Sequence, residues 1–408
     1  MKAWLPIFLC LGCSALIDAV ASDWRQFRGP QGSGVALDAN LPVTLDPKQN
    51  VAWKTDLPGR GHSSPVIVGD RVFITSASGY KGKRLHVLCF DANNGTKLWE
   101  RQFWATGRTT THEKISAAAP SPVSDGERIF ALFSSNDLFC LDLAGNLLWL
   151  RGLMRDYPNA SNGLGMSASP VVADGVFVAQ IESDGEAFAL GIDVVTGLNR
   201  WKIERPHRAN WTSPLTMTGP TGKQQVALQS SAGVQMIEAE TGREIWNYKG
   251  GAATIPSAAL GAGVLYVPSN GITALEPGES GREPRQVWRA AQLRPATSSP
   301  LVLNDRLYIL NDGGILSCAD IREGNRLWQL RLKGPFTSSP VAAGKYLYLV
   351  NEKGVIHVVD PKEPEGQVVS EMDLGETILC TPSIAGHALY LRSDAHLWKI
   401  AQPTARVL

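Results

Sequence analysis

The stretch that decides the fold is TSSPLVLNDRLYILNDGGILSCADIREGNRLW, which runs from Thr297 to Trp328. It consists of short runs of alternating polar and apolar residues, separated by turn residues such as Asn304-Asp305 and Asp312-Gly313-Gly314. Short alternating runs between Asn, Asp and Gly turns are typical of an antiparallel meander. The stretch therefore predicts four consecutive strands, the last of which carries Trp328.

The same unit recurs along the whole chain. Each copy opens on a short, Ser-rich segment, and the residue that ends this segment is, in order, Pro65, Pro122, Pro170, Pro214, Ala258, Pro300, Pro340 or Pro382. The tryptophans of the fourth runs, with one tryptophan ahead of the first copy, are Trp53, Trp99, Trp149, Trp201, Trp246, Trp288 and Trp328. We interpret these tryptophans as structural residues that pack one repeat on the next. Eight four-stranded units, spaced by about 40 to 57 residues, predict an all-β, eight-bladed β-propeller of antiparallel blades.

The two ends of the chain supply the pieces of one blade. The eighth copy stops after its third run, at Ile400, and therefore lacks a fourth strand. A spare tryptophan-bearing run, Asn50–Thr55, lies near the other end. We expect this N-terminal strand to complete the last blade, because the pairing removes an open edge and closes the ring. In the seventh copy, which has no fourth-run tryptophan, Gln367–Glu371 is expected to form the fourth strand.

The chain divides into three parts. Residues 1–21 have the features of a signal peptide, because an apolar run ends at Ala19-Val20-Ala21, a small-x-small cleavage site. Lipid anchoring at Cys13 is an alternative that stays open. Residues 22–49 are interpreted as an N-terminal arm that packs on the ring, and residues 50–408 as a single propeller domain. Either form of export predicts a protein of the periplasm or cell envelope.

Charge and cysteine usage exclude several classes of partner. The formal net charge is +1, which gives no reason to expect nucleic acid as a partner. No window of the mature chain is long and apolar enough to predict a transmembrane segment. No CxxC or clustered Cys/His spacing points to structural zinc. The cysteines of the mature chain are interpreted as small buried hydrophobic residues: Cys89, Cys140, Cys318 and Cys380.

A family resemblance rests on the turn before the fourth run. Asp193-Val194-Val195-Thr196-Gly197, followed by Trp201, resembles the pyrroloquinoline quinone (PQQ)-like repeat, and the Ser-Ser-Pro segments agree with it. Three further motifs are similar to an exported bacterial subfamily: Trp24–Pro30, Pro58–Pro65 and Thr111–Lys114. The wider family includes quinoprotein dehydrogenases and the propeller lipoprotein of the outer-membrane assembly machine. The resemblance implies an eight-bladed ring and leaves the chemistry open.

The resemblance also shows what the chain lacks. Many of the dehydrogenases carry an adjacent Cys-Cys pair, and they bind Ca²⁺ through Glu, Asn and Asp beside a catalytic Asp; neither feature is found in this sequence. We therefore expect no cofactor and assign no catalytic residue. The favoured function is a non-catalytic scaffold that binds another envelope protein or a small polar ligand. The alternative is a quinoprotein oxidoreductase with PQQ and Ca²⁺. No G-x-S-x-G motif supports a hydrolase.

The candidate site lies where the connections between blades are longest. Two of them, Trp99 to Pro122 and Trp149 to Pro170, are much longer than the rest. Long loops on a rigid scaffold are where binding tends to occur. The candidate ligand-binding residues, all placed before innermost strands at the channel mouth, are Arg60, His62, His112, Glu113, Lys114, Asn162 and Trp211. We favour loop-fixing hydrogen bonds over a metal site for the histidines and expect no metal.

Overall fold

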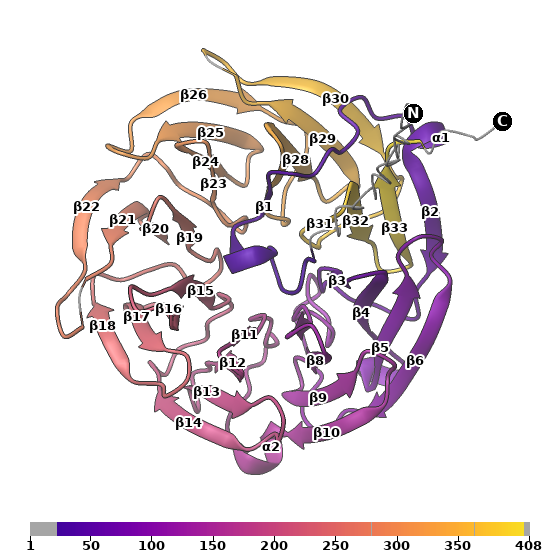
Figure 1. Ribbon diagram of the computed structural model, residues 1–408, viewed down its shortest axis with the longest axis vertical. Coiled ribbons are helices and arrows are strands. Elements are labelled where there is room, and N and C mark those ends of the chain that lie inside the picture. The colour runs from indigo at the N-terminus through magenta and orange to yellow at the C-terminus, as the bar shows by residue number, and fades with distance from the viewer. Residues whose placement is uncertain (1–22, 279, 363, 404–408) are drawn as a thin grey trace, which may run out of the picture.

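The computed structural model describes residues 23–278, 280–362 and 364–403. Eight sheets surround a central channel, and the chain passes through them in order around the ring (Figure 1). The eight-bladed propeller predicted from the repeats is thereby confirmed. The predicted signal peptide and Cys13 lie outside the described residues. Within the described part of the chain, no helix has the length and hydropathy needed to span a bilayer.

Each blade is a four-stranded antiparallel meander whose first strand is innermost and shortest. Blades one to four comprise β3 (Val66–Val68), β4 (Arg71–Ser78), β5 (Arg84–Asp91) and β6 (Lys97–Trp104); β7 (Val123–Ser124), β8 (Arg128–Leu132), β9 (Asp137–Asp142) and β10 (Leu147–Gly152); β11 (Val171–Ala173), β12 (Val176–Ile181), β13 (Phe188–Asp193) and β14 (Asn199–Glu204); β15 (Leu215–Thr218), β16 (Gln224–Ser230), β17 (Gly233–Glu238) and β18 (Glu244–Tyr248).

Blades five to eight continue the ring. They comprise β19 (Ala259–Gly261), β20 (Val264–Ser269), β21 (Gly271–Glu276) and β22 (Arg285–Ala290); β23 (Leu301–Leu303), β24 (Arg306–Leu310), β25 (Ile315–Asp320) and β26 (Arg326–Arg331); β27 (Val341–Ala343), β28 (Tyr346–Val350), β29 (Val355–Asp360) and β30 (Gln367–Asp373); β31 (Ser383–Ala385), β32 (Ala388–Arg392), β33 (His396–Ala401) and β2 (Val51–Asp56). The short elements are β1 (Val35–Ala36), α1 (Pro47–Asn50), α2 (Leu153–Asp156) and two 3₁₀ turns, η1 (Pro30–Gly32) and η2 (Tyr80–Gly82).

The closure predicted from the chain ends is confirmed. Strand β2 pairs antiparallel with β33, with Trp53 opposite Lys399 and Lys54 opposite Trp398. Blade eight is therefore built from both ends of the chain, and its outer edge is supplied by the N-terminal strand. In blade seven, β30 is the outer strand and begins at Gln367, as the sequence predicts.

The recurring tryptophans lie across the boundaries between blades. Trp201 of blade three donates its indole N–H to the carbonyl oxygen of Ala239 in blade four, at 3.0 Å. Its ring covers Gly242, where an added Cβ would lie 2.7 Å from the indole carbons. The same indole-to-carbonyl bond, from one blade to the next, is made by Trp53, Trp99, Trp149 and Trp288. The indole nitrogens of Trp246 and Trp328 have no partner within the described residues.

The hydrophobic core is divided among the boundaries between blades. Each cluster draws on facing strands of neighbouring sheets, as when Phe130 of β8 packs near Phe177 of β12, with ring centroids 5.6 Å apart. The four described cysteines are buried, in agreement with their predicted place in the core. Burial raises the pKa of the Cys89 and Cys140 thiols to about 12, so these cysteines are not reactive thiolates at neutral pH.

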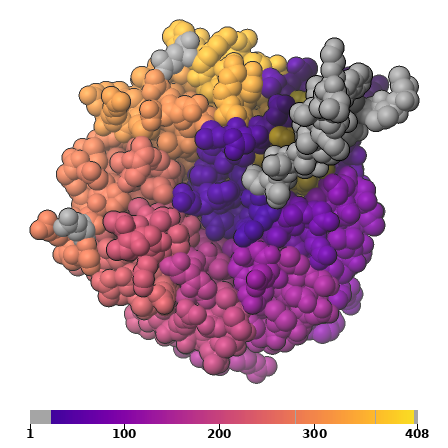
Figure 2. Space-filling model, viewed as in Figure 1, coloured from indigo at the N-terminus to yellow at the C-terminus, as the bar shows by residue number. Residues whose placement is uncertain are grey.

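The N-terminal arm crosses the centre of the ring. The segment that crosses runs from Trp24, which pairs with Ile67 of blade one, to β1, which runs parallel to β27 of blade seven. Between them Arg28 is buried and donates hydrogen bonds to the carbonyl oxygens of Ala258 and Pro300, in blades five and six. Figure 2 shows the indigo atoms of the arm over the middle of this face, where they close one end of the channel.

Candidate binding site in the central channel

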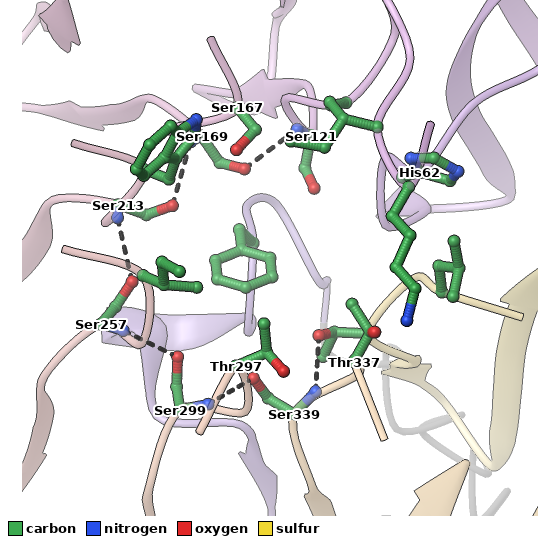
Figure 3. Close-up of a pocket in the computed structure, with 18 of the residues that line it drawn as sticks. His62, Ser121, Ser167, Ser169, Ser213, Ser257, Thr297, Ser299, Thr337 and Ser339 are labelled. Carbon is green, nitrogen blue, oxygen red and sulfur yellow. Dashed lines mark hydrogen bonds between the residues drawn. The ribbon is translucent and has the colours of Figure 1, made fainter. Parts of the chain in front are cut away.

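A pit of about 380 Å³ occupies the channel on the inner side of the arm. Phe27 of the arm projects among the inner ends of the blades, and Trp211, Ile255 and Leu379 add apolar surface. The rest of the lining is dominated by hydroxyl side chains, drawn in Figure 3. The arm closes one end, so ligands can enter from the face that carries the long loops.

A belt of hydroxyl groups runs around the pit. From blade one to blade seven, each belt residue donates its backbone N–H to the hydroxyl oxygen of the belt residue in the next blade, at 2.9–3.0 Å; several of these bonds are dashed in Figure 3. The belt, in blade order from one to eight, is Ser64, Ser121, Ser169, Ser213, Ser257, Ser299, Ser339 and Thr381. All but Ser64 line the pit.

The belt hydroxyl oxygens accept hydrogen bonds from backbone N–H groups, but the hydroxyl hydrogens of the belt stay available. A serine hydroxyl has one O–H donor and two acceptor sites, and the neighbouring N–H occupies only one acceptor site. Within the described part of the chain, the belt hydroxyls that line the pit donate no hydrogen bond. The channel therefore presents a ring of groups that can both donate to and accept from a ligand.

The belt is interrupted between blades eight and one. The Ser64 hydroxyl is buried and has no partner in the described structure. At this boundary the side chain of Arg392, which is 1% exposed, extends from β32 of blade eight to blade one. Its Nη1 donates a hydrogen bond to the carbonyl oxygen of Thr75 at 2.6 Å. Burial lowers the pKa of Arg392 to about 10. Gly61 is required beside it, because an added Cβ would lie 2.1 Å from Arg392 Nη1.

His62 lines the pit next to this seam as a neutral side chain. Only 11% of its side chain is exposed, and neither ring nitrogen has a hydrogen-bond partner within the described residues. Burial lowers the pKa of His62 to about 4, although Asp394, whose Oδ1 lies 3.9 Å from Nε2, acts in the opposite direction. A neutral imidazole carries one donor and one acceptor, and both are unused.

The two long connections meet over the mouth of the pit. His112 donates its backbone N–H to the carbonyl oxygen of Leu164 at 2.9 Å, which joins the loop before blade two to the loop before blade three. Lys114 then reaches blade seven, where its Nζ lies 3.0 Å from Glu352 Oε2. Glu352 also accepts a hydrogen bond from the Thr337 hydroxyl at 2.6 Å. The ion pair between Lys114 and Glu352 thus links the loop before blade two to blade seven at the mouth of the pit, and we call it the latch.

The structure brings together four of the residues proposed from the sequence: His62, His112, Lys114 and Trp211 all line the pit. Arg60 lies beside it, bound to Asp394 at 2.9 Å and to the carbonyl oxygen of Glu113. Glu113 and Asn162 do not line the pit. Asn162 instead caps its own loop by accepting the Leu164 N–H at 2.9 Å. No cluster of three or more His, Cys, Asp or Glu side chains able to hold a metal occurs among the described residues.

Sequence reasoning missed the belt and the arm residue Phe27. The belt residues belong to the Ser-rich segments that open each repeat, and their regular spacing is the sequence feature that could have identified the belt. The spacing alone does not show that the hydroxyl groups of the belt face the central channel. Phe27 reaches the pit because the arm crosses the ring, which depends on contacts between segments that are far apart in sequence.

Comparison with known proteins places the chain in a family. The model of the family described as outer membrane protein assembly factor BamB matches residues 35–248, 230–362 and 312–408, which together cover most of the chain. The chain belongs to this BamB family. Among solved structures, BamB from Moraxella catarrhalis superposes on 88% of this BamB-family chain and 99% of its own, with a TM-score of 0.64 and 14% identity.

Dehydrogenases are also among the proteins similar to this BamB-family chain. Quinohemoprotein alcohol dehydrogenase from Comamonas testosteroni has a TM-score of 0.66 at 11% identity, covering 95% of this chain and 82% of its own. Polyvinylalcohol dehydrogenases of Pseudomonas sp. and Sphingopyxis sp. are 26% and 27% identical over 49% and 45% of this chain. The matches span 36% and 29% of those two relatives. The likeness of the solved structures shows a shared fold.

The lining of the pit does not fit PQQ with Ca²⁺. Calcium binds six to eight oxygen ligands, normally with carboxylates among them, whereas the lining contains no Asp, Glu, Asn or Gln. PQQ itself carries several carboxylates, and the one cationic side chain of the lining, Lys114, is already paired with Glu352. The donor set is instead neutral and rich in hydroxyls.

Proposed function

We propose that this BamB-family propeller is a binding scaffold of the cell envelope, whose central pit holds a small, neutral, hydroxyl-bearing ligand. The observation that carries the proposal is the belt, because its hydroxyls line a cavity that is closed at one end by the arm, and they retain unused donors. A polyol or sugar presents hydroxyl groups that both donate and accept, which matches the capacity of the belt. A volume near the lower end of the usual range for ligand pockets suits a small molecule.

Three further features support a neutral ligand. Phe27 and Trp211 provide flat apolar surface against which the C–H face of a sugar ring can pack. His62 offers an unused donor and an unused acceptor close to the belt. Because buried polar groups are stable only when they are hydrogen-bonded, a ligand that satisfies them gains free energy. The lining presents no acidic group to a cation and no free cation to an anion.

The proposal is tested by saturation-transfer NMR on the mature protein. The neutral probes are glucose, maltose and sorbitol, and the anionic probes are citrate and inorganic phosphate. We expect signal transfer to at least one neutral probe, and competition between neutral probes for one site. Transfer to citrate or phosphate alone, or to no probe at all, would count against the proposal.

A quinoprotein oxidoreductase is the second candidate, because dehydrogenases appear among the relatives. Incubation with PQQ and Ca²⁺, followed by gel filtration, gives a direct test. A stoichiometric bound chromophore with dye-linked alcohol oxidation would replace the scaffold proposal. Envelope location is supported by the match to the family of the outer membrane protein assembly factor BamB, and it is tested by fractionating cells that express the full chain.

A further inference from the structure

Blade one contains a serine, a histidine and a glutamate linked by two hydrogen bonds. Ser78 ends β4, His86 lies on β5 and Glu100 lies on β6. The Ser78 hydroxyl is 2.7 Å from His86 Nε2, and His86 Nδ1 is 2.8 Å from Glu100 Oε1. Diagonal neighbours on one face of an antiparallel sheet come within reach of long side chains. The three groups therefore follow one another across three adjacent strands.

Because Glu100 is ionised, the basic ring nitrogen of His86 is Nε2, which faces the Ser78 hydroxyl. Burial raises the pKa of the Glu100 carboxyl, but hydrogen bonds from Lys97, His86 and Gln102 outweigh burial and hold this pKa at about 2. An ionised Glu100 accepts a hydrogen bond, so His86 Nδ1 carries the hydrogen. In the neutral imidazole, Nε2 is then the acceptor that faces the Ser78 hydroxyl. This order of hydroxyl, imidazole and carboxylate is that of an activated nucleophile.

Two other histidine–glutamate pairs show that this order is not a general feature of the fold. His357 Nδ1 lies 2.8 Å from Glu371, but the neighbour of its Nε2 is the Asn351 amide, at 3.5 Å. Near His396 the Ser393 hydroxyl bonds to Glu376 rather than to the imidazole. Among the described histidines, His86 alone lies between a hydroxyl and a carboxylate.

Ser78 borders a second cavity, separate from the pit. This cavity of about 570 Å³ is lined by Ser78, Lys81, Arg60 and the loop 109–111, among others. His86 is 2% exposed, whereas Ser78 is partly exposed. Gly59 keeps the space beside Ser78 open, because an added Cβ there would lie 2.7 Å from the Ser78 Cβ. The nucleophile is thus accessible while its base is shielded from water.

Backbone donors follow the serine directly. Within the described structure, the N–H groups of Gly79, Tyr80 and Lys81 donate no hydrogen bond to the backbone or to a side chain. Gly79 and Lys81 have φ values of 72° and 53°, so the chain curls tightly after Ser78. Unused backbone N–H groups beside a nucleophile are the donors that stabilise a developing oxyanion.

We propose that Ser78, His86 and Glu100 form a serine-hydrolase centre that cleaves small carboxylic esters with an anionic substituent. Lys81 lines the cavity and forms no ion pair within the described residues, and no acidic side chain lines the cavity. A substrate carboxylate can therefore be bound beside Ser78. This site lies outside the central pit and is independent of the function proposed for the pit.

The reaction balances without a further reactant. Ser78 Oγ attacks the ester carbonyl carbon while its proton moves to His86 Nε2. The C–O bond to the alcohol breaks, and the alcohol leaves with the proton from His86. Water then gives a proton to His86 and attacks the acyl carbon. The bond between the acyl carbon and Ser78 Oγ breaks, and His86 returns the proton to Oγ, which releases the carboxylic acid and restores Ser78 and the neutral imidazole. Glu100 remains ionised and stabilises the imidazolium.

The test combines covalent labelling with ester hydrolysis on the mature full chain. A fluorophosphonate probe is added, and the modified peptide is identified by mass spectrometry. Hydrolysis of 3-acetoxybenzoate, which is anionic, is compared with that of phenyl acetate, which is neutral. We expect the label on Ser78 and faster hydrolysis of 3-acetoxybenzoate. Ser78→Ala should abolish labelling and lower the rate by about 100-fold or more.

The variants separate catalysis from folding. His86→Gln should lose activity, and Glu100→Gln should shift the pH–rate profile, while far-UV circular dichroism stays unchanged. Ser393→Ala is the matched control, because Ser393 bonds to a carboxylate near a histidine without contacting its ring, and its activity should equal that of the unmodified chain. Label on residues other than Ser78, or equal hydrolysis by Ser78→Ala and the parent, would overturn the proposal.

Discussion

Trp201 of blade three lies against Gly242 of blade four, at a position where no side chain larger than hydrogen fits. Gly242 has φ +70°, and an added Cβ would approach the Trp201 ring to 2.7 Å. One residue thus satisfies two demands: the positive φ of the turn and the contact with the neighbouring blade. The pairing of a large flat residue with a glycine recurs at Trp53 with Gly95, and at Trp99 with Gly145.

The first prediction concerns Gly242→Ala. The methyl group would meet the Trp201 ring, so the free energy of unfolding should fall by about 1–3 kcal/mol beyond the cost of a positive φ. Gly222→Ala is the matched control, because Gly222 has φ +81° and an added Cβ would meet nothing within 4 Å. The control should cost about 1–2 kcal/mol. Urea unfolding of both variants measures the difference, and equal losses would contradict the packing role.

The second prediction concerns ring closure. A chain that starts at Leu57 lacks the arm and β2, so the edge of β33 becomes exposed and should associate with other molecules. A chain that starts at Asn50 lacks the arm but keeps β2, so it should melt at a higher temperature and remain monomeric. Differential scanning calorimetry and size-exclusion chromatography provide the comparison. Indistinguishable melting of the two truncations would show that β2 does not close the ring.

The third prediction concerns His62 and pH. Its pKa is about 4 in the folded protein and 6.5 as the ordinary value, so the unfolded chain binds more protons between these values. Protonation of His62 therefore lowers the free energy of unfolding progressively as the pH falls from 6.5 toward 4, and has no effect on it above pH 6.5. The charged groups that act on it are Asp394, Arg392 and Arg60. His62→Leu should flatten the decline of stability in this window.

The same substitution bears on the pit. His62→Leu removes two buried nitrogens without partners, which should raise the free energy of unfolding at neutral pH by about 1–3 kcal/mol. It should also weaken the binding of any neutral ligand that forms a hydrogen bond with the imidazole. Higher stability together with weaker binding is the expected pair of results. Lower stability at neutral pH would indicate that His62 is already satisfied in the free protein.

The fourth prediction concerns the latch between Lys114 and Glu352. The Lys114 side chain is 55% exposed, so the pair should contribute little to stability, about 0–1 kcal/mol. Lys114→Met should therefore leave the melting temperature almost unchanged but speed the entry of a probe that binds the pit, measured by stopped-flow. Lys353→Met, in the same turn as Glu352, is the control. A large loss of stability, or no change in entry rate, would count against a latch.

Local sequence features predicted the blades, because each strand and turn is specified within one repeat. Asp193 shows this: its carboxylate accepts the N–H groups of Val195 and Thr196, which fixes the turn before Trp201 from neighbouring residues alone. The closing strand was also predictable, since a spare tryptophan strand at one end matched a missing strand at the other.

The site was only partly predictable, because it depends on distant contacts. Position before an inner strand was sufficient to identify His62 and Trp211 as residues of the channel. It did not separate His112 and Lys114, which line the pit, from Glu113 between them, whose carbonyl binds Arg60. The place of Phe27 depends on the path of the arm.

The measurement that tests the central claim most directly is calorimetric binding of the tightest neutral probe to the parent and to a belt variant. Ser213→Thr, Ser257→Thr and Ser299→Thr keep each acceptor oxygen but add methyl groups at the pit, and Thr381 shows that threonine is compatible with the belt. Ser231→Thr, outside the lining, is the control. We predict loss of binding in the triple variant, with unchanged melting and with binding retained in the control. Equal affinity in all three proteins would place the ligand elsewhere and contradict the account.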